Sequence, residues 1–317
     1  MTCPPAPTAA TERRRGHTAH GPVAAVVVGV VLFSTGPVMV AAADVSGPVF
    51  SFWRLWIGTA GLAVVSGLYC ATTGHWPSRR GWVWAAVAGV AFGLHQVCFM
   101  SAIKATSVVD VTLMNTLAPI VVGALAVPLF GERPGVRFRA WSAVAILGAA
   151  LVATAGSAGP EGDPAGMVLA AANVAFYAVF FVWSKQARDH IDTVPFLFGN
   201  VAVAAVLVSG FVTVAGEVVT PVSTHDLWLA FAVAALPGVL GHFSVTWSLR
   251  WVPANLPPVL MLAIPVLSGL GAWAVLGQRV TPAQTLAGVV TLAGVMGAVR
   301  SSESAMPVEA MTRAEEP

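Results

Sequence analysis

The sequence predicts an all-α integral membrane protein with ten transmembrane helices, arranged as two inverted five-helix repeats with both termini in the cytosol. The composition is the first reason, because 57% of the 317 residues are hydrophobic and 9% are charged. A soluble domain carries about 25% charged residues. The mean hydropathy of +0.80 therefore indicates a chain that needs lipid as its solvent. The other two reasons are an internal repeat and the placement of Lys and Arg.

Apolar runs between polar breaks define the ten helices, since about 20 apolar residues cross a hydrocarbon core. In the first half the predicted helices are Pro22–Ala42, Pro48–Cys70, Gly81–Ile103, Val108–Phe130 and Ala140–Ala155. In the second half they are Met167–Ser184, Pro195–Val214, Leu227–Leu249, Ala254–Leu276 and Pro282–Val299.

The N-terminal residues 1–20 are polar and predict a disordered cytosolic tail. The basic run Arg13–Arg15 ahead of an apolar segment is also typical of a secretory signal peptide. The apolar segment Gly21–Ala42 is longer than the hydrophobic region of most signal peptides. We therefore expect it to remain as the first transmembrane helix.

Basic residues fix the predicted orientation. With both termini in the cytosol, all but three of the 16 Lys and Arg lie on the cytosolic side. The exceptions are Arg54, Lys104 and Arg279. The predicted outer loops 156–166 and 215–226 contain acids and neither Lys nor Arg. An excess of Lys and Arg on the cytosolic side is the usual bias of membrane proteins.

Sequence similarity recurs at a constant offset along the chain. Phe130-Gly131-Glu132-Arg133 corresponds to Leu276-Gly277-Gln278-Arg279, and Pro119 corresponds to Pro265. A copy of five helices, an odd number, inverts the second copy relative to the first, which is a recurring transporter architecture. The predicted repeats are residues 21–155 and 167–300, joined by an outer linker 156–166 and followed by a disordered cytosolic tail 301–317.

The first repeat also resembles a known family. The stretch Gly93–Val152, with Ser101–Ser107, Leu117-Ala118-Pro119 and Phe130–Arg133, is similar to the EamA domain of the drug/metabolite transporter superfamily. The second repeat is similar but more diverged. The resemblance implies a secondary carrier of small metabolites, often an exporter of amino acids or related compounds, that works by alternating access. We expect the protein to lie in the plasma membrane.

Arg54 is a candidate substrate ligand, because ionisable groups inside a membrane are costly. Its guanidinium could hold a substrate carboxylate in a bidentate pair. The alternative is an anchor whose charge reaches toward the membrane surface. Asn200 is the equivalent residue of the second repeat and keeps polarity without charge.

Two histidines lie at nearly equivalent places in the two repeats. His95, followed by Gln96, belongs to the third predicted helix, and His242 belongs to the eighth. A histidine titrates near neutral pH, so protons are a candidate coupling ion. The pair could instead bind substrate while neutral, or either ring could fill an interhelical hydrogen-bonding role.

Prolines interrupt two predicted helices at matching places. Asn115 precedes Pro119 by about one turn, and Pro257, Pro258 and Pro265 interrupt the ninth helix. Such matched interruptions are a sequence indicator of a transport site, although prolines also serve packing. In the sixth helix, Asn173, Tyr177 and Phe181 share one face that could line a cavity or pack against a neighbouring helix.

The remaining expectations concern partners. Cys3, Cys70 and Cys98 are scattered, and two histidines make too few ligands, so no metal or cofactor is expected. Lipid and a small-molecule substrate are the expected partners, without nucleic acid, for a monomer or a homodimer. A passive channel or facilitator and an intramembrane enzyme remain as alternatives, although neither a charged pore ring nor a nucleophile–base pair is visible in the sequence.

Overall fold

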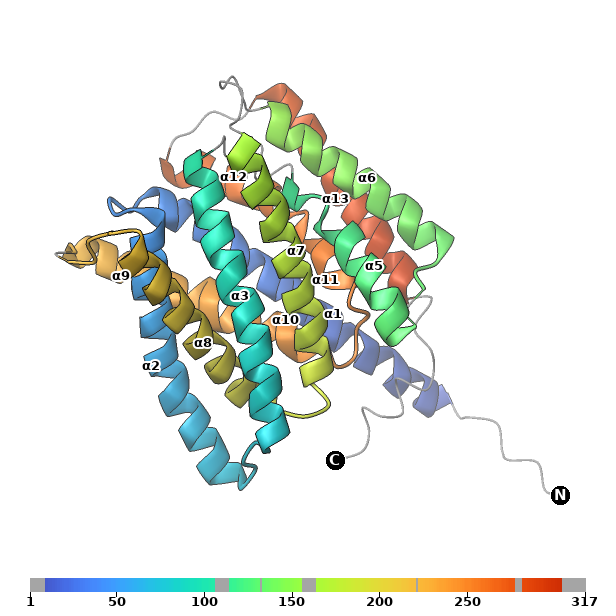
Figure 1. Ribbon diagram of the computed structural model, residues 1–317. Coiled ribbons are helices and arrows are strands. Elements are labelled where there is room, and N and C mark those ends of the chain that lie inside the picture. The colour runs from blue at the N-terminus through green and yellow to red at the C-terminus, as the bar shows by residue number, and fades with distance from the viewer. Residues whose placement is uncertain are drawn as a thin grey trace.

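The computed structural model describes residues 9–105, 114–131, 133–155, 164–220, 222–276 and 281–303. The secondary structure of these residues is helical, and none of them forms a strand (Figure 1). The first half contains α1 (Ala9–Ala41), α2 (Gly47–Thr73), α3 (Arg79–Ala105), α5 (Ala118–Phe130) and α6 (Val136–Ala155). The second half contains α7 (Pro164–Ala187), α8 (Thr193–Val214), α9 (Thr224–Val233), the π-helix η1 (Ala234–Gly241), α10 (His242–Ser248), α11 (Leu256–Met261), α12 (Ile264–Leu276) and α13 (Pro282–Glu303).

The described helices lie within or around the predicted segments, with differences at the ends. The helix α1 begins at Ala9, inside the segment predicted to be disordered, since its Ala, Glu and Arg residues are good helix formers. The helix α13 continues to Glu303. Lys104 is the last residue but one of α3, whereas Asp110 and most of the linker 156–166 lie outside the described residues.

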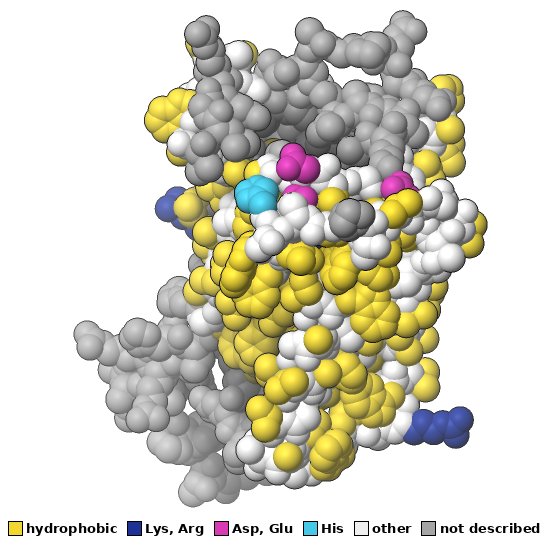
Figure 2. Space-filling view, turned by 90° about the vertical axis from the view of Figure 1, so that its left-hand side faces the viewer, with side chains coloured by type: hydrophobic (Ala, Val, Ile, Leu, Met, Phe, Trp, Pro, Cys, Tyr) yellow, Lys and Arg dark blue, Asp and Glu magenta, His cyan; other side chains and the backbone are white. Residues whose placement is uncertain are grey.

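Within the described parts of the chain, seven helices are long and apolar enough to cross a membrane. They are Gly21–Val40, Gly47–Thr73, Arg79–Phe99, Pro164–Ala187, Thr193–Val214, Thr224–Ser248 and Pro282–Ser301. Large apolar side chains such as Val64 and Leu147 are 63% and 64% exposed. Figure 2 shows apolar side chains covering much of one face, with acidic side chains gathered toward one end. An apolar outer surface of this kind identifies a multi-pass membrane protein.

Two helices are interrupted at equivalent positions of the repeats. A turn at residues 116–117 precedes α5, and a turn at residues 262–263 precedes α12. Each new helix begins one residue before a proline, Pro119 or Pro265. A proline donates no backbone hydrogen bond and favours the first turn of a helix. The same residue type therefore breaks the fourth and ninth predicted segments at the same place.

Glycines allow the helices to approach closely. Gly89 and Gly93 of α3 face α8, where a side chain at Gly89 would lie 2.7 Å from the Asn200 carbonyl oxygen. Gly148 of α6 faces Thr291 of α13, and these two helices run side by side at one edge of the bundle (Figure 1). Small residues at such interfaces bring backbones together in membrane proteins. The helix α3 packs against both α7 and α8.

Candidate functional site

Arg54 faces a small cavity inside the bundle. The cavity is lined by α2, α3, α8, η1 and α10, with Arg54, Phe92, Val201, Gly238 and His242 among the lining residues. It has room for about one water molecule. Among the described residues, no acidic side chain lies within ion-pair distance of Arg54. The guanidinium is therefore a partly buried positive charge without a described counter-ion.

The π-helix η1 brings His242 to this cavity. It contains Pro237, whose missing N–H weakens regular α-helical bonding, and its wider turn places Gly238 and Val239 on the cavity wall. The first residue after the π-helix is His242. Its ring meets Phe33 and Phe92 edge-on, with centroids 4.8 and 5.1 Å away. The sequence predicts one continuous helix here and gives no sign of the π-helix beyond Pro237.

A second group of polar side chains lies around α7. Asn173 Nδ2 donates to Asn115 Oδ1 at 2.7 Å, and Tyr177 Oη donates to Met261 Sδ at 2.7 Å. His95 interacts with Asn173, and the ring centroids of His95 and Tyr177 are 5.0 Å apart. The structure thus brings together four predicted residues, namely Asn115, Asn173, Tyr177 and His95, and adds Met261, which sequence reasoning missed.

Phe92 contacts both groups. Its ring centroid lies 5.9 Å from that of His95 and 5.1 Å from that of His242. Phe92 therefore contacts both histidines, of which only His242 is among the residues that line the cavity. Arg54 is close enough to interact electrostatically with both rings.

Two other candidates have different surroundings. Gln96 is buried at 7% exposure, and the described contacts place it in neither polar group. Asn200 is buried on α8, where its backbone packs against Gly89 of α3. Among the described residues, no cluster of His, Cys, Asp or Glu could hold a metal ion.

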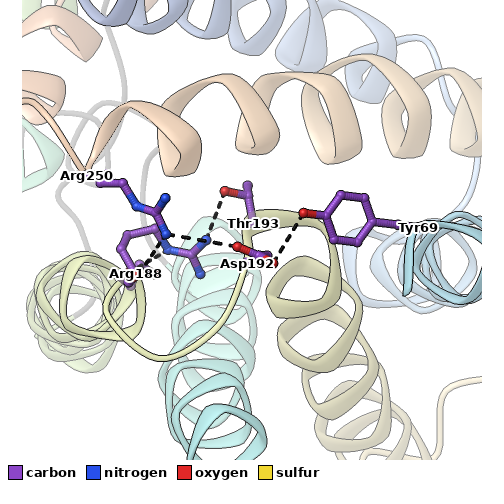
Figure 3. A network of polar contacts seen from close by, with 6 residues as sticks. Tyr69, Arg188, Asp192, Thr193 and Arg250 are labelled. Atoms are coloured by element: carbon purple, nitrogen blue, oxygen red, sulfur yellow. Dashed lines mark hydrogen bonds and ion pairs between the residues drawn. The ribbon is translucent and has the colours of Figure 1, made fainter. Parts of the chain in front are cut away.

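A polar network joins α2 to two turns, the one between α7 and α8 and the one after α10 (Figure 3). Tyr69 Oη donates to Asp192 Oδ2 at 3.2 Å, and Arg250 Nη2 lies 4.0 Å from Asp192 Oδ1. Arg188 Nη1 donates to Thr193 Oγ1 at 3.0 Å, while the Arg188 carbonyl accepts from Arg250 Nη2 at 3.1 Å. The network links α2, the α7–α8 turn and the segment after α10.

Arg188 is the buried member of this network. It is 3% exposed, and burial, with Arg250 nearby, lowers its pKa to about 9. The side chain therefore keeps its charge at neutral pH. Sequence reasoning missed this network, although Tyr69 is one of only two tyrosines in the chain and Asp192 occupies a helix N-cap position.

Comparison with known proteins identifies the family. Residues 21–154 and 164–300 each match the EamA-like transporter family, so the match occurs twice and covers most of the chain. The chain belongs to the EamA-like transporter family. This confirms the resemblance seen in the sequence.

Two similar proteins extend over nearly the whole EamA-like chain. An uncharacterized transporter of Archaeoglobus fulgidus is 28% identical over 283 residues, which cover 87% of this chain and 96% of the relative. A protein known from a crystal structure is 19% identical, with a TM-score of 0.76 over 88% of this chain and 98% of that one. The likeness to the crystal structure shows that the two chains share a fold. The family and the Archaeoglobus relative identify a transporter and point away from an enzyme.

Proposed function

We propose that this EamA-like protein is a secondary active exporter of small anionic or zwitterionic metabolites, and that it works by alternating access in the plasma membrane. The substrate binds in the Arg54–His242 cavity. The observation that carries the proposal is Arg54, a positive charge that faces a cavity with no described acid as its partner. A carboxylate from the substrate would supply the missing charge and form a strong bidentate hydrogen bond.

The site lies where the two predicted repeats meet. Arg54 and Phe92 come from the first half, whereas Val201, Gly238 and His242 come from the second. A site at the interface of inverted repeats can open to either side when one half rocks against the other. The cavity has room for about one water molecule, which supports an occluded conformation that must widen to admit substrate.

The proposed topology has ten membrane-spanning segments and both termini in the cytosol. The helices α6, α5 and α11–α12 supply the three segments beyond the seven long apolar helices. Single cysteines placed in a variant without the native ones test this topology. We expect residues 156–166 to react with an impermeant thiol reagent from outside, and residues 1–8 to react only after permeabilisation. The reverse pattern contradicts the proposed orientation.

Transport itself is tested with purified protein in liposomes. We expect saturable exchange of radiolabelled carboxylates against internal unlabelled compound, screened over a metabolite panel, and its loss in Arg54→Gln. A conductance that does not saturate would instead support a passive channel. Conversion of substrate into a new compound would support the intramembrane enzyme.

The histidines are candidates for coupling transport to protons. His95→Gln and His242→Gln are measured for flux under an imposed pH gradient. If proton antiport uses either ring, its replacement removes the dependence of flux on the gradient. An unchanged dependence in both variants contradicts histidine-mediated coupling.

A further inference from the structure

The polar group around α7 contains two buried atoms without hydrogen-bond partners. Among the described residues, neither Asn173 Oδ1 nor His95 Nδ1 completes a hydrogen bond. Asn173 is fully buried. A buried polar atom that lacks a partner is costly, and native proteins rarely keep one without a reason. The two side chains lie close enough to interact with each other, and a ligand group that donates hydrogen bonds could engage both atoms from a place between them when Nδ1 of the neutral histidine is the acceptor.

Tyr177 adds a third group that a ligand could engage. Its hydroxyl donates to the Met261 thioether, and sulfur is a weak acceptor. The tyrosine oxygen can accept a hydrogen bond from a ligand while its O–H still donates to Met261. The group therefore offers an amide oxygen, a phenol oxygen and an imidazole nitrogen, none of which carries a charge when the histidine is neutral.

Aromatic rings surround this same place. The centroids of Phe92, Phe99 and Tyr177 lie 5.9, 6.2 and 5.0 Å from that of His95. Aromatic faces attract cations, and neutral oxygen acceptors suit N–H donors. An ammonium group matches both features, whereas a carboxylate would face acceptors alone.

The positive charge of Arg54 determines which second charged group the ligand needs. This charge reaches His95, so a lone cation beside His95 would be repelled. A carboxylate bound to Arg54 removes this repulsion. The two groups therefore favour a ligand that carries both charges.

We propose that the substrate is an elongated zwitterion, with its carboxylate on Arg54 in the cavity and its ammonium group between His95 and Asn173, beside the cavity. This inference rests on the proposed function and names the substrate class of the same site. The two positions are distinct, because Phe92 lines the cavity and contacts His95, whereas neither His95 nor Asn173 is among the residues that line it. An α-amino acid carries its amine and carboxylate on one carbon and reaches only one position with its charged groups. An ω-amino acid reaches both.

Three small compounds test the separation of charges directly. 6-Aminohexanoate and 2-aminohexanoate are isomers that differ in the position of the amine, and hexanoate lacks the amine. Binding to the purified full-length protein in nanodiscs is measured by isothermal titration calorimetry. We expect 6-aminohexanoate to bind about tenfold tighter than either of the others, since its ammonium gains charge-assisted hydrogen bonds. Equal affinities, tighter binding of 2-aminohexanoate, or no binding by any of the three overturns the inference.

Two variants test the ammonium position separately. Asn173→Leu removes the amide, and His95→Phe keeps a ring while removing its nitrogens. In either variant we expect 6-aminohexanoate to bind only as tightly as hexanoate, with hexanoate unchanged. An unchanged preference for 6-aminohexanoate in a folded variant, shown by a single size-exclusion peak, overturns the assignment. His95→Phe supplies the test if Asn173→Leu does not fold.

Arg54→Gln distinguishes this inference from the proposed function. Equal binding of the three compounds to the native protein, all lost in Arg54→Gln, overturns the elongated zwitterion while the anion site stands. Carboxylate exchange that persists in Arg54→Gln overturns the anion site, and the zwitterion with it.

Discussion

Asn115 and Met261 occupy equivalent positions of the two repeats, and each forms a hydrogen bond to α7. Asn115 precedes Pro119 by four residues, and Met261 precedes Pro265 by four. Their partners, Asn173 and Tyr177, are one turn apart on α7. The helix α7 therefore forms a hydrogen bond to the chain just before each of the two helix interruptions. A relative movement of the two halves must change at least one of these contacts.

Arg54 is expected to serve function at the expense of stability. A buried charge without a partner is costly, and replacing it with an apolar side chain is often neutral or stabilising. We predict that Arg54→Met leaves the free energy of unfolding unchanged or raises it by about 1 kcal/mol, while carboxylate exchange is lost. Thermal unfolding in nanodiscs and liposome flux check the two parts. A large fall in stability would indicate a structural anchor instead.

The sequence was sufficient for the parts of the fold that depend on local patterns. Apolar length places the helices, and proline at a fixed offset places the breaks before α5 and α12. The resemblance to the EamA domain rests on similar local motifs. These features need no knowledge of distant contacts, which is why they can be read from one chain.

The candidate site was predicted less completely, since it depends on distant contacts. Arg54, His95 and His242 stand out because polar residues are rare in apolar helices. The contact of Phe92 with both histidines could not be predicted, because phenylalanine is common in such helices. The bond from Tyr177 to Met261 joins residues 84 positions apart, and methionine gives no polar signal.

The Asn115–Asn173 bond should stabilise the break before α5. Each single change to Ala leaves the other amide short of a buried partner, and we predict a loss of about 1–3 kcal/mol in the free energy of unfolding. The double variant should lose less than the sum of the two single losses. Denaturant unfolding of all four proteins in one detergent measures the coupling. Simple additivity would show that the bond contributes little.

The α6–α13 contact predicts a strong effect at Gly148. A side chain there would lie 2.6 Å from the Thr291 backbone nitrogen, which cannot rotate away. We predict that Gly148→Ala lowers the free energy of unfolding by about 1–3 kcal/mol, as overpacking does in other cores. The matched control is Gly61→Ala in α2, where a side chain meets nothing within 4 Å. This control should be neutral or stabilising, because Ala is the better helix former. Equal effects would contradict the close contact.

One side-chain hydrogen bond, or tie, connects the helices α2 and α8 near each end, and the two ties should affect access to the cavity from different sides of the membrane. Tyr69 Oη donates to Asp192 at one end, and Ser46 Oγ donates to Glu217 Oε2 at 3.0 Å at the other. Each tie includes the N-cap residue of a helix, Asp192 for α8 and Ser46 for α2. In the proposed orientation the Tyr69 tie closes the cytosolic side. Removing one hydrogen bond of about 1 kcal/mol should raise the open population several-fold.

Val201→Cys, in a variant without the native cysteines, reports this opening because Val201 lines the cavity. We predict that Tyr69→Phe speeds labelling of this cysteine from the cytosolic side several-fold, and that Ser46→Ala speeds it from the outside. Inside-out and right-side-out vesicles separate the two directions. Tyr69→Phe keeps the ring and removes only the hydroxyl, so its packing is preserved. Faster labelling from both sides in both variants would indicate general loosening, and unchanged rates would show that neither tie controls access.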